Sequence, residues 1–70
     1  MIGNQHVTPR PDGNWQHIGA GNRRATGVFN TQLEAIKSAR QVAINNGTSV
    51  VIHGRDGRIF DVISFSNKNN

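Results

Sequence analysis

One segment of this sequence, residues 31–46, carries both a start signal and a stop signal for a helix. It opens with Thr31-Gln32-Leu33-Glu34, a capping box in which Thr31 accepts from the backbone N–H of Glu34 and the Glu34 carboxylate accepts from the N–H of Thr31. It closes with Asn45-Asn46-Gly47, a pattern typical of a left-handed helix end. A lone helix of this length needs a second layer to cover its apolar face, so this segment constrains the fold strongly.

The pattern within the helix indicates which side is covered. At 100° per residue, its apolar side chains fall within an arc of about 200°, and polar side chains occupy the other side. Ile36 is expected at the centre of the buried interface, and three alanines indicate close approach to a sheet. The arc consists of Leu33, Ala35, Ile36, Ala39, Val42, Ala43 and Ile44.

Short extended segments flank the helix on both sides. Residues 6–20 read as a hairpin, because the prolines, Asp, Gly and Asn of residues 9–14 are strong turn formers. Residues 25–30 could add a third short strand, although Gly27 weakens that interpretation. After the helix, residues 49–53 and 58–63 are the two clearest strands, joined by the tight connection Gly54-Arg55-Asp56-Gly57.

These elements predict an α+β fold in the order strand, strand, possible strand, helix, strand, strand. We expect an antiparallel sheet of four or five strands with the helix packed on one face. A chain of 70 residues and 7.7 kDa has room for one core. We expect residues 1–5 to be a loose N-terminus, 6–63 the single domain and 64–70 a flexible polar tail.

Composition excludes several classes of protein. Because the chain has no cysteine, disulfide scaffolds, thiolate zinc sites and thiol nucleophiles are excluded. Apolar runs such as Val50-Val51-Ile52 are too short to cross a bilayer or to form a signal peptide. We therefore expect a soluble cytoplasmic protein without a membrane partner.

Several short motifs occur in a recognisable order along the chain. They are His6-Val7-x-Pro9, Asp12-Gly13-x-Trp15, Phe29-x-Thr31-x-x-Glu34-Ala35-Ile36 and Val51-Ile52-His53-Gly54-Arg55-Asp56-Gly57-Arg58-Ile59. This succession resembles a family of small bacterial and phage proteins known as a domain of unknown function, and it covers roughly residues 6–60. The resemblance implies a standalone domain of one helix and a small sheet, and it implies no activity or cofactor.

Charge gives the first indication of a partner. The formal net charge is +4, and six of the eight cations are arginines, whose planar guanidinium suits phosphate and carboxylate groups. Arg55 and Arg58 lie in a turn whose glycines and Asp56 are explained by turn chemistry alone, while the arginines are not. Arg23 and Arg24 follow a glycine-rich stretch and are expected to be exposed, for which a solvated pair is the simpler explanation.

The leading hypothesis is a small non-enzymatic binding module that contacts nucleic-acid phosphates through Arg55, Arg58, Arg23 and Arg24. Trp15 could stack on a base, but in a chain so poor in aromatic residues a core position is favoured. The alternative is a protein-interaction or accessory factor, either a phage-type modulator of a host protein or a homodimer. Its contact surface would be a sheet edge or an uncovered sheet face.

The histidines raise a metal site and an enzyme as further alternatives. His6, His17 and His53 match no local ligand spacing, so we predict no metal site, and no cofactor or small-molecule substrate is evident. A third hypothesis pairs His53 with Asp56 or Asp61 as acid and base of a ribonuclease-like toxin. One helix and a small sheet build a substrate cleft with difficulty, so we predict no catalytic residues and no enzyme.

Overall fold

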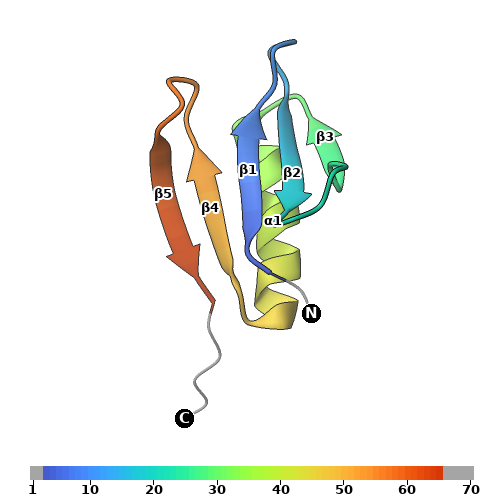
Figure 1. Ribbon diagram of the computed structural model, residues 1–70, viewed down its shortest axis with the longest axis vertical. Coiled ribbons are helices and arrows are strands. Elements are labelled where there is room, and N and C mark those ends of the chain that lie inside the picture. The colour runs from blue at the N-terminus through green and yellow to red at the C-terminus, as the bar shows by residue number, and fades with distance from the viewer. Residues whose placement is uncertain (1–2, 66–70) are drawn as a thin grey trace.

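The computed structural model describes residues 3–65 and contains five strands and one helix (Figure 1). The strands are β1 (Gln5–Pro9), β2 (Trp15–Gly19), β3 (Gly27–Phe29), β4 (Ser49–His53) and β5 (Ile59–Ser64), and the helix is α1 (Gln32–Asn46). They form one sheet in the order β3-β2-β1-β4-β5, and α1 packs on one side of it. The expected α+β fold is confirmed, and of the four or five strands expected the sheet has five, because the possible third strand forms as β3.

The sheet is mixed, whereas an entirely antiparallel one was expected. β1 pairs parallel with β4, with Gln5 opposite Val50 and Val7 opposite Ile52, while the other three pairs are antiparallel. The reason is the helical connection. Parallel neighbours require a crossover of a dozen or more residues, and α1 supplies one by carrying the chain from β3, at one edge, to β4 beside β1.

The strand boundaries also correct the expected ends of the domain. Gln5 belongs to β1 and is buried, so residue 5 is part of the fold and not of a loose start. Ser64 ends β5, and Phe65 packs against the core while its N–H donates to the carbonyl of Thr48, so these two residues are not part of a flexible tail. The rest of that expected tail, 66–70, lies outside the described residues.

The helix signals are confirmed at both ends. The hydroxyl of Thr31 accepts from the N–H of Glu34 at 3.2 Å, and the Glu34 carboxylate accepts from the N–H of Thr31 at 3.2 Å. Gly47 adopts φ 67°, a left-handed conformation, and its N–H donates to Ala43 O. In the described part of the chain no helix is long and apolar enough to cross a membrane.

The buried side of α1 is narrower than expected. Ala35, Ala39 and Ala43 are fully buried, at a spacing of four residues that keeps them within about 80° of the helix surface. Leu33 and Ile44 are exposed, and Ile36 is only partly buried at the side of the core, so its expected central position is wrong. A single sheet covers only a narrow stripe of a helix that approaches it closely, and this is why the wide arc is not buried.

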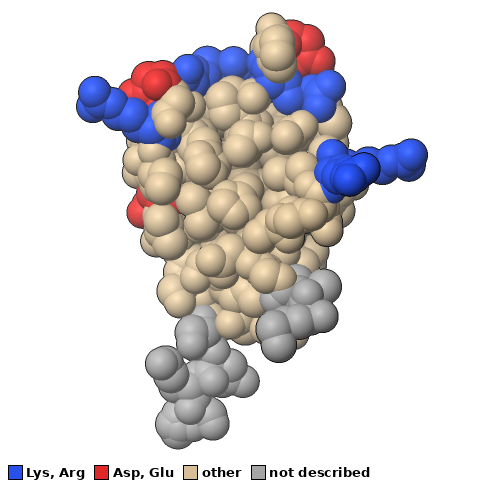
Figure 2. Space-filling view, viewed as in Figure 1, with Lys and Arg blue, Asp and Glu red and all other residues tan. Residues whose placement is uncertain are grey.

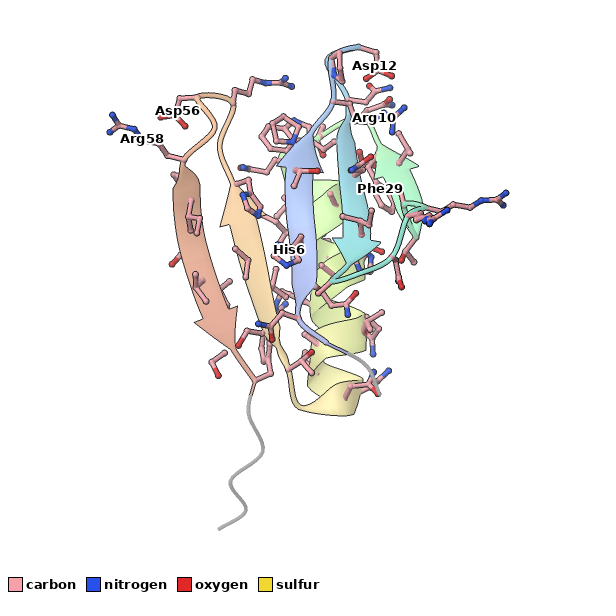
Figure 3. All side chains as sticks on the ribbon, viewed as in Figure 1. His6, Arg10, Asp12, Phe29, Asp56 and Arg58 are labelled. Carbon is pink, nitrogen blue, oxygen red and sulfur yellow. The ribbon has the colours of Figure 1, made fainter. Side chains whose placement is uncertain are left out.

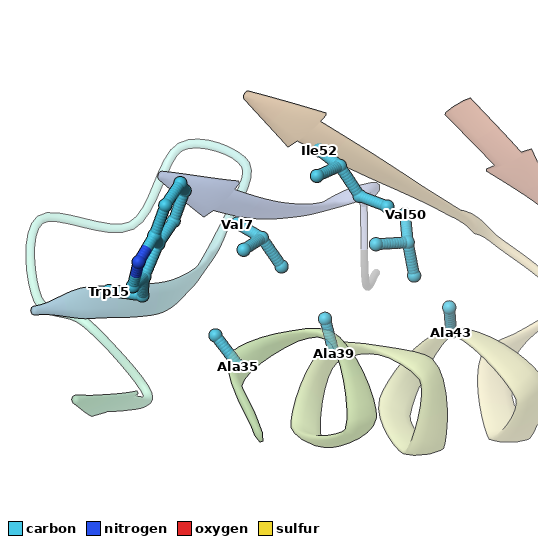
Figure 4. Packing of buried hydrophobic residues seen from close by; sticks show 7 residues of the cluster. All are labelled: Val7, Trp15, Ala35, Ala39, Ala43, Val50 and Ile52. Carbon is cyan, nitrogen blue, oxygen red and sulfur yellow. The ribbon is translucent and has the colours of Figure 1, made fainter. Parts of the chain in front are cut away.

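The core lies between that stripe and the inner side of the sheet (Figure 4). From the strands it receives Val7, Trp15, Val50 and Ile52. Trp15 is 8% exposed, and the expected core position of this side chain is therefore confirmed. Gly27 is accommodated in β3 because the ring of Phe29 lies over it, where an added Cβ would be 2.8 Å from a ring carbon.

Candidate functional site

Within residues 3–65 no element covers the side of the sheet that faces away from α1, and we call this side the open face. Side chains alternate along a strand, so the residues between the buried ones lie on the open face. They are His6 and Thr8 of β1, Gln16 and Ile18 of β2, Val51 and His53 of β4, and Val62 of β5, which is opposite Val51. Figure 2 views this face: its middle is uncharged, and the Lys and Arg side chains gather at its margins.

Two histidines meet in the middle of the open face. His6 Nδ1 lies 3.0 Å from His53 Nε2, and the two rings are stacked with centroids 5.3 Å apart. Both side chains are half-buried. Burial, followed by the neighbouring His53, lowers the pKa of His6 below its ordinary value. Parallel pairing of β1 with β4 creates this contact across 47 residues of sequence, so no local spacing could have revealed it.

β5 forms one edge of the sheet and exposes a group of apolar side chains. Ile59, Phe60 and Val62 are 60%, 71% and 52% exposed. Phe60 lies at a bulge beside His53, because Ile52 pairs with Asp61 while His53 pairs with Ile59. The Asp61 carboxylate accepts from the N–H of Val62 at 2.8 Å, so this edge amide is already occupied.

Arg55 is held against the fold. Its guanidinium carbon lies 4.7 Å from the centre of the Trp15 ring, and its Nη2 donates to the carbonyl of Gly13 at 2.7 Å. These contacts join the turn after β4 to the turn after β1. These contacts give Arg55 a structural role, and its expected contact with phosphate stays a prediction.

The remaining predicted arginines have free charges. Arg58 extends from the β4–β5 turn (Figure 3), and Arg23 and Arg24 are exposed on the β2–β3 connection. Within residues 3–65 the ion pair that forms joins Arg10 to Asp12 at 3.4 Å, so none of these three cations is paired. The structure thus divides the four predicted arginines between two connections and does not gather them into one cluster.

Arg10 was not among the expected site residues. Its Nη1 donates to Gln16 Oε1 at 2.8 Å, and its ion pair with Asp12 partly neutralises its charge. Arg10 lies at the same end of the sheet as Arg58 (Figure 3). The backbone N–H of Asn14, followed by Arg10, lowers the pKa of Asp12. The sequence contained a signal for the position of Arg10, because this residue stands between two prolines and a turn was expected there.

The turn of residues 54–58 has the geometry that its glycines and aspartate indicate. Gly57 has φ 84°, and the Asp56 carboxylate accepts from the N–H of Arg58 at 3.0 Å. This confirms the interpretation of Asp56 as a turn residue. It also means that neither carboxylate of the ribonuclease hypothesis is joined to His53 by a hydrogen bond in the described part of the chain, since Asp61 bonds Val62 and His53 bonds His6.

The third histidine lies on the other side of the sheet. His17 is fully buried, with Nε2 2.6 Å from Gln5 Oε1 and Nδ1 2.8 Å from the hydroxyl of Ser38. An amide oxygen accepts only, so Nε2 carries the hydrogen and Nδ1 accepts from Ser38. Burial lowers the pKa of His17. Because the sheet separates His17 from the other two histidines, the three do not form one site.

The described residues offer little space for a small molecule. One shallow cavity of about 220 Å³ lies beside Gln5, Asn22 and Thr26, and no charged residue lines it. Typical ligand pockets occupy about 300–1,000 Å³. Across residues 3–65, no group of three or more His, Cys, Asp or Glu side chains could hold a metal ion.

Comparison with known proteins identifies the family. Residues 5–65 match DUF2188, which is described as an uncharacterised protein conserved in bacteria. The chain is 33% identical over 55 residues to the uncharacterised protein YdaT of Bacillus subtilis strain 168, a match that covers 79% of this chain and 36% of that protein. The chain thus spans about a third of the length of this relative, and no solved structure matches it significantly. The match over nearly all of the described fold shows that this chain belongs to the DUF2188 family.

Proposed function

We propose that the open face binds single-stranded nucleic acid. The observation that carries this proposal is the combination of an uncharged, uncovered sheet face with unpaired arginines at its margins (Figure 2). A ligand that fits such a surface presents flat rings to the middle and negative charge to the edge. Bases and phosphates of a single strand have this arrangement.

The middle of the face offers stacking surfaces. The paired rings of His6 and His53 lie on the open face itself, and Phe60, 71% exposed at the bulge of the edge strand β5, adds an aromatic ring next to His53 at the margin of that face. Phenylalanine and histidine are among the side chains on which unstacked bases lie in sheet-based RNA-binding domains. In a duplex the base faces are covered by their neighbours, so this surface favours single strands.

The margins supply the electrostatic contribution. Arg58 at one end and Arg23 and Arg24 on the β2–β3 connection carry charges that no carboxylate neutralises in residues 3–65. The whole chain has a formal net charge of +4. Each phosphate that an arginine neutralises releases condensed counterions, which favours binding at low salt.

Fluorescence anisotropy with a labelled oligothymidine and a labelled oligouridine tests the charge contribution. If three marginal arginines contact phosphates, log K against log salt should have a slope of about −2, from roughly −0.7 per contact on a single strand. Arg58→Ala should flatten the slope by about 0.7. Lys37→Ala is the matched control, because Lys37 is an exposed cation on α1, behind the sheet, and its removal should leave the slope nearly unchanged.

The stacking contribution is tested with Phe60→Leu, which keeps apolar bulk and removes the aromatic ring. Stacking contributes about 1–3 kcal/mol per base, so affinity should fall about tenfold. Leu33→Ala, which changes another exposed apolar residue, on the helix behind the sheet, should bind like the wild type. Absence of binding to both oligonucleotides at 50 mM salt would refute the proposal.

A protein partner is the second candidate, because Ile59, Phe60 and Val62 form an exposed apolar group on the edge strand β5. A second copy of the chain is one such partner. Sedimentation equilibrium distinguishes this case: dimerisation that Phe60→Leu leaves intact and Val62→Lys abolishes, without any nucleic-acid binding, would favour it.

A further inference from the structure

The contact between His6 and His53 suits a chelating pair for a metal ion. We propose that His6 Nδ1 and His53 Nε2 together bind a divalent late transition metal, with Cu²⁺ preferred and Ni²⁺ next. This proposal concerns metal alone and does not rest on nucleic-acid binding.

The distance between the two nitrogens supports this proposal. Metal–imidazole bonds are about 2.0–2.1 Å long. Two nitrogens 3.0 Å apart therefore hold a metal with an N–metal–N angle of about 95°. That angle is close to the 90° between neighbouring ligands of a tetragonal site, the geometry that Cu²⁺ and Ni²⁺ adopt with nitrogen and oxygen ligands. A tetrahedral zinc site would need about 3.3 Å between the nitrogens, so zinc fits less well.

The two strands fix the nitrogens beside each other before any metal arrives. β1 and β4 are central, hydrogen-bonded neighbours, and both histidines are half-buried on the open face. A metal ion bound to one of these nitrogens therefore reaches the second nitrogen without further ordering of the backbone. The chelate is therefore much stronger than a single surface histidine.

The protonation state is compatible with metal binding. A hydrogen bond between two ring nitrogens requires a free lone pair on one of them, so at least one ring of the pair is neutral. When the metal binds, the hydrogen shared between the rings moves to the far nitrogen of the ring that carries it. Two metal–nitrogen bonds form, both imidazoles are neutral, and water fills the remaining coordination positions on the open face.

Calorimetric titration of the untagged protein with CuCl₂, NiCl₂ and ZnCl₂ at pH 7.5 tests the affinity order. We expect a 1:1 site that binds Cu²⁺ most tightly. His6→Gln and His53→Gln should each weaken Cu²⁺ binding about 100-fold, because each removes one arm of the chelate. The third histidine, His17, is retained in both variants and serves as the internal control.

Two spectroscopic measurements keep the proposal testable if a variant unfolds. Electron paramagnetic resonance of the wild-type Cu²⁺ complex should show hyperfine coupling to two imidazole nitrogens. Nuclear magnetic resonance should show paramagnetic broadening centred on His6 and His53 and weak at His17. Coupling to a single imidazole, broadening centred elsewhere, or unchanged affinity in a folded His6→Gln/His53→Gln variant would overturn the proposal.

Discussion

Replacing Ala39 with leucine should destabilise this protein, although leucine is more apolar and also a good helix former. Ala35, Ala39 and Ala43 are all 0% exposed and lie between the helix axis and the sheet (Figure 4). A leucine at position 39 adds three carbon atoms where Val7, Val50 and Ile52 already fill the core. Overpacking of this kind typically costs about 1–3 kcal/mol, and we expect the upper part of that range because a single layer of side chains separates helix from sheet.

The matched control is Leu33→Ala, which removes three carbon atoms from the same helix. Leu33 is 60% exposed, so this substitution should change the free energy of unfolding by less than about 0.5 kcal/mol. For a domain of this size, 1 kcal/mol shifts Tm by about 4–8 °C, so Ala39→Leu should lower Tm by roughly 10–20 °C. Thermal and urea unfolding followed by circular dichroism measures both. If Ala39→Leu matches the wild type while Leu33→Ala is strongly destabilised, the assignment of the buried side of α1 is wrong.

Four further outcomes follow from the contacts described. Thr31→Ala should lower the free energy of unfolding, measured with urea, by about 1 kcal/mol, because the backbone N–H of Glu34 loses its acceptor. Unchanged stability would refute the capping role. Ile36→Ala should lower the free energy of unfolding by about 1–2 kcal/mol, below the usual range for a central core residue, since Ile36 is only partly buried. A larger loss would show that Ile36 lies at the centre of the core. Arg55→Ala should lower stability by about 1 kcal/mol and Arg55→Lys by less, through the lost contacts with Trp15 and Gly13. Because burial holds the pKa of His17 below 6.5 in the folded protein, the unfolded chain takes up a proton first, so stability present above pH 6.5 should fall as pH drops towards 5; a Tm that rises on acidification would contradict this.

Local signals in the sequence predicted the elements whose geometry is local. The capping box at Thr31 and the turn at Gly57 each depend on a few adjacent residues, and both occur where the pattern places them. The two hairpins follow from the same kind of signal, since turn residues lie between alternating segments. Trp15 entered the core as expected, because an isolated large aromatic residue has few alternatives in so small a chain.

The features that escaped prediction depend on contacts between distant segments. The parallel pairing of β1 with β4, and hence the contact of His6 with His53, arises from where the helix delivers the chain. Buried His17 escaped because its partners, Gln5 and Ser38, come from β1 and α1. One signal did exist, since the alternation Trp15-x-His17 puts both residues on the same side of β2. The contact of Arg55 with the Trp15 ring also escaped prediction, because the two residues lie 40 positions apart in the sequence.

The central place of β1 has a consequence for biosynthesis. Among the strands of this domain β1 is synthesised before the others and has two neighbours in the sheet, and one of them, β4, ends 44 residues after Pro9, the last residue of β1. The hairpin of β1 and β2 is complete at Gly19, 34 residues before the end of β4, so at about 5–20 residues per second it waits roughly 2–7 s with the inner edge of β1 unpaired. A nascent chain in this state presents the surface that chaperones or another nascent copy would bind. A ribosome stalled before Ser49 would therefore hold a hairpin that cannot complete its sheet, which makes translation speed across α1 a factor in the yield of folded protein.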